Sequence, residues 1–214
     1  MNSSLLPPSG GYRSLRSFQL AQLIFDITVH FVKLYIPQNS RTCDQMTPAA
    51  RSGVQNIAEG SVASATSKKT ELKLTNVARA SLEELKLDYE DYLRQHGLCR
   101  WSKEHPLYRE FVALRIGTKR QFREFVRRAM DGNELQQTTT DRRIAASATV
   151  GRCPLKSVVV ANATLLLLRS ADYLLMRQIQ RQATDFEKNG GFTERLYRIR
   201  SGKRDKNAGK GTGK

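Results

Sequence analysis

Basic side chains recur at short intervals between residues 115 and 128. The spacing places several of them on one side of a helix and puts Phe111, Phe122 and Phe125 on the other side. Because an arginine guanidinium meets phosphate oxygens with two parallel hydrogen bonds, such a helix can rest its aromatic face on the protein and offer cations outward. The pattern predicts a basic helix at 107–130, whose candidate phosphate-binding residues are Arg115, Lys119, Arg120, Arg123, Arg127 and Arg128.

A second basic cluster lies near the C-terminus. The chain has 36 Lys and Arg against 20 Asp and Glu, and most of its net charge of +16 falls in 98–130 and 195–214. A localised excess of this kind favours RNA or DNA as the partner, bound through phosphates because no base-reading module is evident. A solvated solubility tail remains an alternative, whereas the tail lacks the Trp and Leu anchors that favour a membrane. The candidate residues in this cluster are Arg195, Arg198, Arg200, Lys203 and Arg204.

The chain offers no arrangement typical of a catalytic or metal site. His96, Cys99 and His105 are close in sequence, but a zinc site normally takes four ligands. Glu59 has no evident second acid or base at a defined distance, so pairing with an arginine or capping a helix is the simpler interpretation. We therefore expect a protein that is not an enzyme and that has no metal and no cofactor.

The sequence also shows no pattern typical of a secretory signal or a membrane span. The first residues lack the apolar run of a secretory signal, and the apolar run at 158–168 is shorter than the ~18–20 residues of a membrane span. The three cysteines are widely spaced and odd in number, which does not suggest a disulfide framework. These features predict a cytoplasmic protein.

Four segments repeat apolar residues every three or four positions, as helices with one buried face do. They cover 18–36, 46–60, 67–97 and 154–190, with Ser17, Thr47 and Ser67 as N-caps. Such helices pack most simply as an antiparallel up-down bundle. The prediction is an all-α four-helix bundle with an inserted basic helix and a flexible basic C-terminal tail.

The predicted helices and basic segments divide the chain into five parts. They are a flexible leader at 1–16, bundle helices at 17–97, a basic insertion at 98–153 that ends in a loop, the fourth helix and a suffix at 154–200, and a disordered basic tail at 201–214.

The fourth helix has a wider apolar stripe than one bundle face requires. Five of its apolar residues lie outside the face that would point to the bundle core. A helix that is apolar on more than one face needs a second surface to cover it. The pattern favours self-association; the alternative is that the inserted helix covers the stripe within one subunit. The five residues outside that face are Val159, Val160, Leu166, Leu167 and Leu174.

Several strings resemble the four-helix-bundle family of 23S rRNA intervening-sequence proteins, which includes the Avd-like accessory proteins of diversity-generating retroelements. Residues 51–60 read RSGVQNIAEG, 67–71 read SKKTE, and 77–85 read VARASLEEL. Residues 173–178 (YLLMRQ) and 190–197 (GGFTERLY) resemble the suffix extension that some members carry. The residues matching the family strings are Asn56, Glu59, Gly60, Leu82 and Glu83, for which structural roles are expected, with Asn56 as a hydrogen-bonding residue between helices.

The resemblance implies a non-enzymatic bundle that assembles as a pentamer, binds nucleic acid and, in retroelements, a reverse transcriptase. Two functions remain open from the residues themselves: a self-associating nucleic-acid-binding protein, or a structural oligomer or protein–protein scaffold with no direct nucleic-acid role. The acidic residues Glu83, Glu84, Asp88, Glu90 and Asp91 form either a solvated face or a docking strip for basic residues of a neighbouring subunit.

Overall fold

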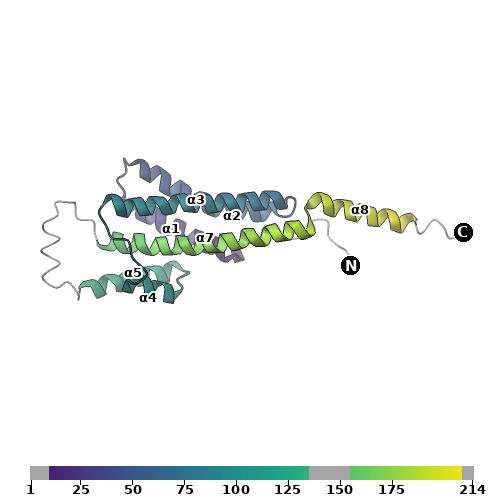
Figure 1. The fold of residues 1–214 in the computed structure, drawn as a ribbon. Coiled ribbons are helices and arrows are strands. Elements are labelled where there is room, and N and C mark those ends of the chain that lie inside the picture. Colours follow the sequence, from purple (N-terminus) through teal and green to yellow (C-terminus); the bar gives the residue numbers. More distant parts are fainter. Residues whose placement is uncertain (1–9, 135–154, 209–214) are drawn as a thin grey trace.

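A computed structural model describes residues 10–134 and 155–208, and in these ranges the protein is all-helical, without a strand. The described part contains a 3₁₀-helix and seven α-helices (Figure 1). They are η1 (Gly11–Ser14), α1 (Arg16–Tyr35), α2 (Arg41–Ala63), α3 (Lys68–Gln95), α4 (Pro106–Leu114), α5 (Lys119–Glu134), α7 (Leu155–Asn189) and α8 (Phe192–Ala208).

Four long helices form the body of the molecule. Helix α1 packs against α2 and α7, and α3 packs against the same two helices. The centre of this body holds Phe31 against the ring of Tyr89, whose centroid lies 4.9 Å away. The Tyr89 hydroxyl donates to Thr28 Oγ1 at 3.1 Å, so the buried phenol is satisfied. Burial raises the pKa of Tyr89.

Helix α7 is long and apolar. Within the described part, it contains a window whose length and hydropathy would suffice to cross a membrane, but 61% of that window is buried inside the protein. The buried core helix of a soluble protein can have the same length and hydropathy, so these two properties alone do not indicate a membrane span.

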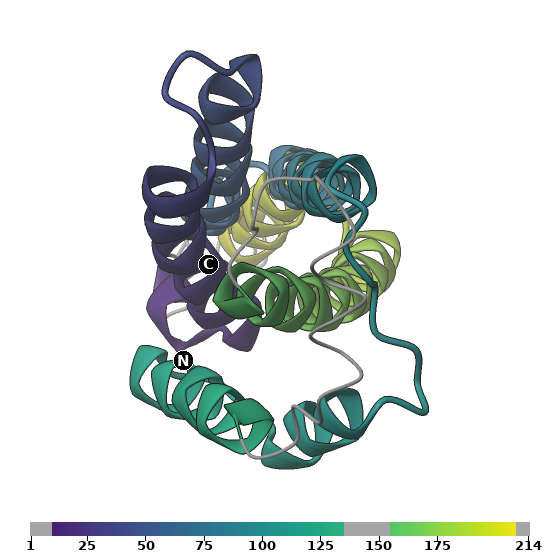
Figure 2. The same ribbon diagram turned by 90° about the vertical axis from the view of Figure 1, so that its left-hand side faces the viewer.

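The two helices α4 and α5 form a separate pair beside the body. Both pack on α7, and α5 also contacts α1, so α1 and α7 lie between this pair and the α2–α3 pair (Figure 2). Residues Val159 and Leu167 of the wide α7 stripe are 2% exposed. Val160 is also buried, but Leu166 and Leu174 are only partly buried, so the stripe is covered in part within one chain.

The predicted single helix at 107–130 is two helices. Arg115 ends α4 in the left-handed conformation, with φ +46°. The side chains of Thr118 and Gln121 then start α5 by reciprocal capping: Gln121 N donates to Thr118 Oγ1 at 3.3 Å, and Thr118 N donates to Gln121 Oε1 at 3.1 Å. The prediction missed this capping box.

Two segments near the ends of the described ranges, 11–14 and 201–208, are helical where the sequence predicted a flexible leader and a disordered tail. Residues expected in a flexible leader form η1, where Tyr12 packs edge-on against Phe18 at 4.8 Å and Gly10 N donates to Ser61 O at 3.2 Å. At the other end, α8 continues to Ala208, where disorder was expected from 201. The remaining residues of the leader (1–9), the loop (135–154) and the tail (209–214) lie outside the described ranges.

Of the three predicted helix N-caps, Ser67 is confirmed, whereas Ser17 and Thr47 are wrong. Ser67 caps α3 by accepting from Thr70 N at 3.1 Å, as expected. Ser17 is instead buried inside α1, where its hydroxyl donates to Gln178 Oε1 at 2.7 Å. Helix α2 begins at Arg41 with Ser40 as its cap, so Thr47 lies within it and Pro48 is tolerated inside the helix.

Candidate nucleic-acid interface

Helix α5 presents basic side chains on the face that points away from the body. Its buried positions Phe122, Phe125, Val126 and Ala129 follow the period of a helix and face α7 and α1. Phe125 is fully buried, and its ring lies 4.9 Å from that of Phe111 on α4. This aromatic contact fixes which face of α5 is turned outward.

Arg120, Arg123 and Arg127 lie on this outward face at spacings of three and four residues, and all three are exposed. Arg120 and Arg123 make no ion pair with a carboxylate of the described ranges. We call these three residues the α5 ridge. Its guanidiniums come from neighbouring turns of one helix, an arrangement that can follow successive phosphates.

Three cations of the insertion, one of them the ridge residue Arg127, are partly neutralised by their own molecule. Arg127 pairs with Asp131, Arg128 with Glu110 and Lys119 with Asp26, in each case with nitrogen and oxygen 3.4 Å apart. All six side chains are at least 38% exposed. Exposed pairs of this kind contribute about 0–1 kcal/mol, so a phosphate can displace the carboxylates at little cost.

Arg115 does not belong to the ridge. It lines a hollow of about 740 Å³ between α1, α4 and α7, together with Arg16 and Arg169. The floor of this hollow is apolar, and no carboxylate lines it. Sequence reasoning missed Arg16 and Arg169 because each is a single cation on an otherwise apolar helical stripe.

The second basic cluster lies far from the first. Helix α8 extends past the ends of α2 and α3 that lie opposite the α4–α5 pair (Figure 1). Arg198 donates to Asn189 O, and Arg200 is exposed. The side chains of Arg195, Lys203 and Arg204 lie outside the described part, although their backbone belongs to α8. The structure therefore does not bring the two predicted clusters together.

The residues of the family strings hold α2 against α3. A Cβ on Gly60 would meet Glu71 O and Leu74 Cβ at 3.3 Å, so Gly60 serves close packing. Leu82 is buried and lies over Gly53, while Glu83 pairs with Lys86.

The polar residues of the same strings differ from expectation. Asn56 bonds to Ser52 within its own helix, and the link across to α3 is made by the Ser52 and Ser81 hydroxyls at 3.0 Å. Glu59 is exposed and makes no ion pair with a described residue, contrary to the expected pairing or capping.

The histidines and the cysteine of the possible ligand cluster have other contacts. His96 Nδ1 lies 2.8 Å from Tyr92 O, and His105 Nδ1 accepts from Leu107 N at 3.2 Å to cap α4. Cys99 Sγ donates to Arg100 O at 3.4 Å. Each side chain thus has a local structural role.

Comparisons with protein-family models, curated proteins and solved structures gave no match to this chain. The resemblance to the intervening-sequence and Avd-like proteins therefore stays a prediction from the strings in the sequence.

Proposed function

We propose that this protein binds RNA or DNA through phosphate contacts and has no catalytic activity of its own. The observation that carries the proposal is the α5 ridge, because Phe125 and its neighbours hold Arg120, Arg123 and Arg127 toward solvent. Arginines fixed on one face of an anchored helix suit a polyanion better than a small acidic ligand. The exposed Arg198 and Arg200 on α8 extend the basic surface at the other end.

The proposal includes an architecture and an assembly. In this architecture α1, α2, α3 and α7 form an antiparallel up-down four-helix bundle, to which α4 and α5 are an addition. We further propose that the protein is cytoplasmic, forms a pentamer and acts as an Avd-like accessory to a reverse transcriptase. The support for these three points is the sequence resemblance and the absence of an evident secretory signal. Light scattering tests the assembly, with an expected mass of about five times the 24.2 kDa chain.

The phosphate-binding proposal predicts a specific salt dependence. Fluorescence anisotropy with a labelled RNA or DNA, repeated over a range of salt concentrations, should give log K falling linearly with log salt. Replacing Arg120, Arg123 and Arg127 together by Ala removes up to three phosphate contacts, so the slope should decrease by about 2–3 and the affinity should fall at least tenfold.

A charge-matched control separates the ridge from the overall charge. Arg51, Lys69 and Lys73 are exposed on α2 and α3, which pack chiefly on each other and on α1 and α7, and their replacement by Ala removes the same charge. This control should leave the slope within about one unit of the parent protein. Equal losses in both triple variants would show that the ridge is not the interface, and the absence of any salt-dependent binding would exclude the function.

A further inference from the structure

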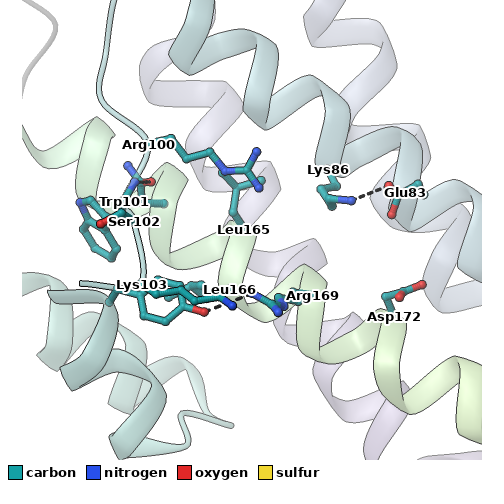
Figure 3. A pocket seen from close by; sticks show the side chains of 12 residues that line it. Glu83, Lys86, Arg100, Trp101, Ser102, Lys103, Leu165, Leu166, Arg169 and Asp172 are labelled. Carbon is teal, nitrogen blue, oxygen red and sulfur yellow. Dashed lines mark hydrogen bonds and ion pairs between the residues drawn. The ribbon is translucent and has the colours of Figure 1, made fainter. Parts of the chain in front are cut away.

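A second cationic hollow opens on the side of the body, between α3, the connection at 99–105 and α7 (Figure 3). Its volume is about 370 Å³, and four cationic side chains line it. Lys86 comes from α3, Arg100 and Lys103 from the connection, and Arg169 from α7. These residues are distant in sequence and are brought together only by the fold.

The carboxylates at this hollow are already engaged. Glu83 pairs with Lys86 at 2.5 Å, and Asp172 pairs with Arg79 at 2.6 Å. Lys103 and Arg169 make no ion pair with any carboxylate of the described residues. The hollow therefore keeps a positive charge that its own surroundings do not neutralise.

Arg100 can contribute to the same charge. It pairs with Glu90 at 2.9 Å, but its side chain is 60% exposed. An exposed pair of this kind is easily exchanged for a phosphate.

The backbone that carries these cations is held in place by one buried amide. Asn162 Oδ1 accepts from Trp101 N at 2.8 Å, and Asn162 Nδ2 donates to Cys99 O at 3.0 Å. Asn162 is 2% exposed, so these bonds clamp the connection onto α7. The Trp101 ring adds a stack on His105, with centroids 5.2 Å apart. The positions of Arg100 and Lys103 are thereby preorganised.

Arg169 is also oriented before any ligand binds. Its Nη1 donates to the Tyr108 hydroxyl at 3.2 Å, which uses one of five donors and leaves the rest of the guanidinium available. Arg169 and Tyr108 also line the hollow between α1, α4 and α7 that contains Arg115. The two hollows therefore adjoin at these residues. The cations thus continue from Lys103 through Arg169 to Arg115 at the junction of α4 and α5.

An aromatic side chain stands beside this path. Tyr173 lines the hollow between α1, α4 and α7 and is 54% exposed. The Arg177 guanidinium lies 5.8 Å from the centroid of its ring. Alternating cations and exposed aromatic faces are typical of surfaces that bind single strands, whose bases are free to stack. A hollow of about 370 Å³ has room for one nucleotide unit of an unpaired strand.

We propose that this hollow binds a phosphate of single-stranded nucleic acid through Arg169 and Lys103, and that the strand continues across α7 toward Tyr173 and Arg115. The inference rests on the proposed nucleic-acid binding but assigns it a strand type and a second site. It makes Arg169 the residue shared by both hollows.

The experiment compares strand types in the full-length chain. Anisotropy is measured with a fluorescein-labelled 12-nucleotide pyrimidine RNA, the same DNA sequence, and blunt duplexes of equal length. Replacing Arg169 and Lys103 together by Ala should weaken single-strand binding at least tenfold and lower the salt slope by about 0.7, the value for one phosphate contact. Duplex affinity should change less than twofold.

Two controls keep the test decisive. Lys69→Ala with Lys73→Ala removes the same charge elsewhere and should leave single-strand binding unchanged, while circular dichroism verifies that each variant is folded. Arg169→Lys keeps the charge but loses the forked geometry, so intermediate binding is expected.

The outcomes separate the two proposals. Equal losses for single strands and duplexes would overturn the assignment to single strands. A double variant that behaves like its control would overturn the hollow as a binding site and leave the α5 ridge as the interface. Tighter binding of uridine monophosphate than of the 12-nucleotide strand would overturn the assignment to a strand. If the parent protein bound none of the probes, the proposed function itself would fail.

Discussion

The contact between Gly53 and Leu82 is one of the points at which α2 approaches α3 most closely. A Cβ on Gly53 would lie 2.6 Å from Leu82 Cδ2, and Leu82 is only 3% exposed. Gly53→Ala is therefore expected to lower the free energy of unfolding by about 1–3 kcal/mol through overpacking. Urea denaturation followed by circular dichroism measures the change.

The reason for this loss can be tested in a second background. Leu82→Ala should itself cost about 2–5 kcal/mol by leaving a cavity. In that background the new methyl at position 53 has room, and alanine's better helix propensity should make Gly53→Ala neutral or stabilising by up to about 1 kcal/mol. The same destabilisation in both backgrounds would speak against the contact.

Asp88 on α3 is a residue whose charge opposes folding. Burial, followed by the carboxylates of Asp91 and Glu84, raises the pKa of Asp88 above its ordinary value. A raised folded-state pKa means that the folded protein binds the proton more tightly than the unfolded chain does. The penalty is therefore present above the folded-state pKa and disappears as the pH falls below the unfolded-state value.

Asp88→Asn should accordingly stabilise the protein at pH 7, by at least the ~0.2–0.5 kcal/mol of one like-charged pair a turn apart, because it relieves both the burial of the charge and its repulsion by Asp91 and Glu84. The gain should shrink toward zero as the pH is lowered through the titration of Asp88. Thermal melting of both proteins between pH 3 and pH 7 measures it. A gain that stays constant over this range would mean that the charge of Asp88 is not the cause.

At the scale of elements, the break between α4 and α5 depends on the backbone of Arg115. Its φ of +46° is the one left-handed conformation of a non-glycine residue in the described ranges. Such a conformation costs an L-residue about 1–2 kcal/mol, a cost that glycine avoids. Arg115→Gly should raise the unfolding free energy by about 1 kcal/mol, whereas Arg115→Ala, which removes the same side chain, should not. If both variants had equal stability, the strain would be absent.

Local signals explain which elements could be predicted. The cap at Ser67 and the 3.6-residue period of α3 and α7 depend on neighbours in sequence, so these helices were placed correctly. The same period on both sides of Arg115 suggested one helix because Thr118 and Gln121 were not recognised as a capping box. The spacing placed Arg120, Arg123 and Arg127 on one side of a helix, but it also included Arg115, which ends α4.

Tertiary contacts explain what could not be predicted. Lys86, Lys103 and Arg169 meet only because Asn162 clamps the 99–105 connection onto α7. In the sequence Asn162 was visible as a polar residue inside an apolar run, but its partners Trp101 and Cys99 lie about sixty positions away. The path of a loop over a helix face is not encoded in periodicity.

At the scale of the whole molecule, the α4–α5 pair shields α7, and Phe125 is the centre of that contact. Phe125 is fully buried among Phe111, Trp101 and the face of α7. Helix α5 contacts α7 and α1, whereas α2 and α3 pack chiefly on each other and on those two helices. The pair should therefore be able to open without unfolding the body.

Phe125→Ala tests this separation. Loss of the ring should cost about 3–5 kcal/mol, a cost borne mainly by the docking of α4 and α5. Hydrogen exchange followed by mass spectrometry should show faster exchange of the α4 and α5 amides, with protection retained in α2 and α3. Tyr197→Ala, which removes a ring that is 72% exposed, serves as the control and should change neither region. Uniform loss of protection in α2 and α3 would show that the α4–α5 pair and the body unfold as one unit, and the α5 ridge would then owe its position to the cooperative fold of the entire chain.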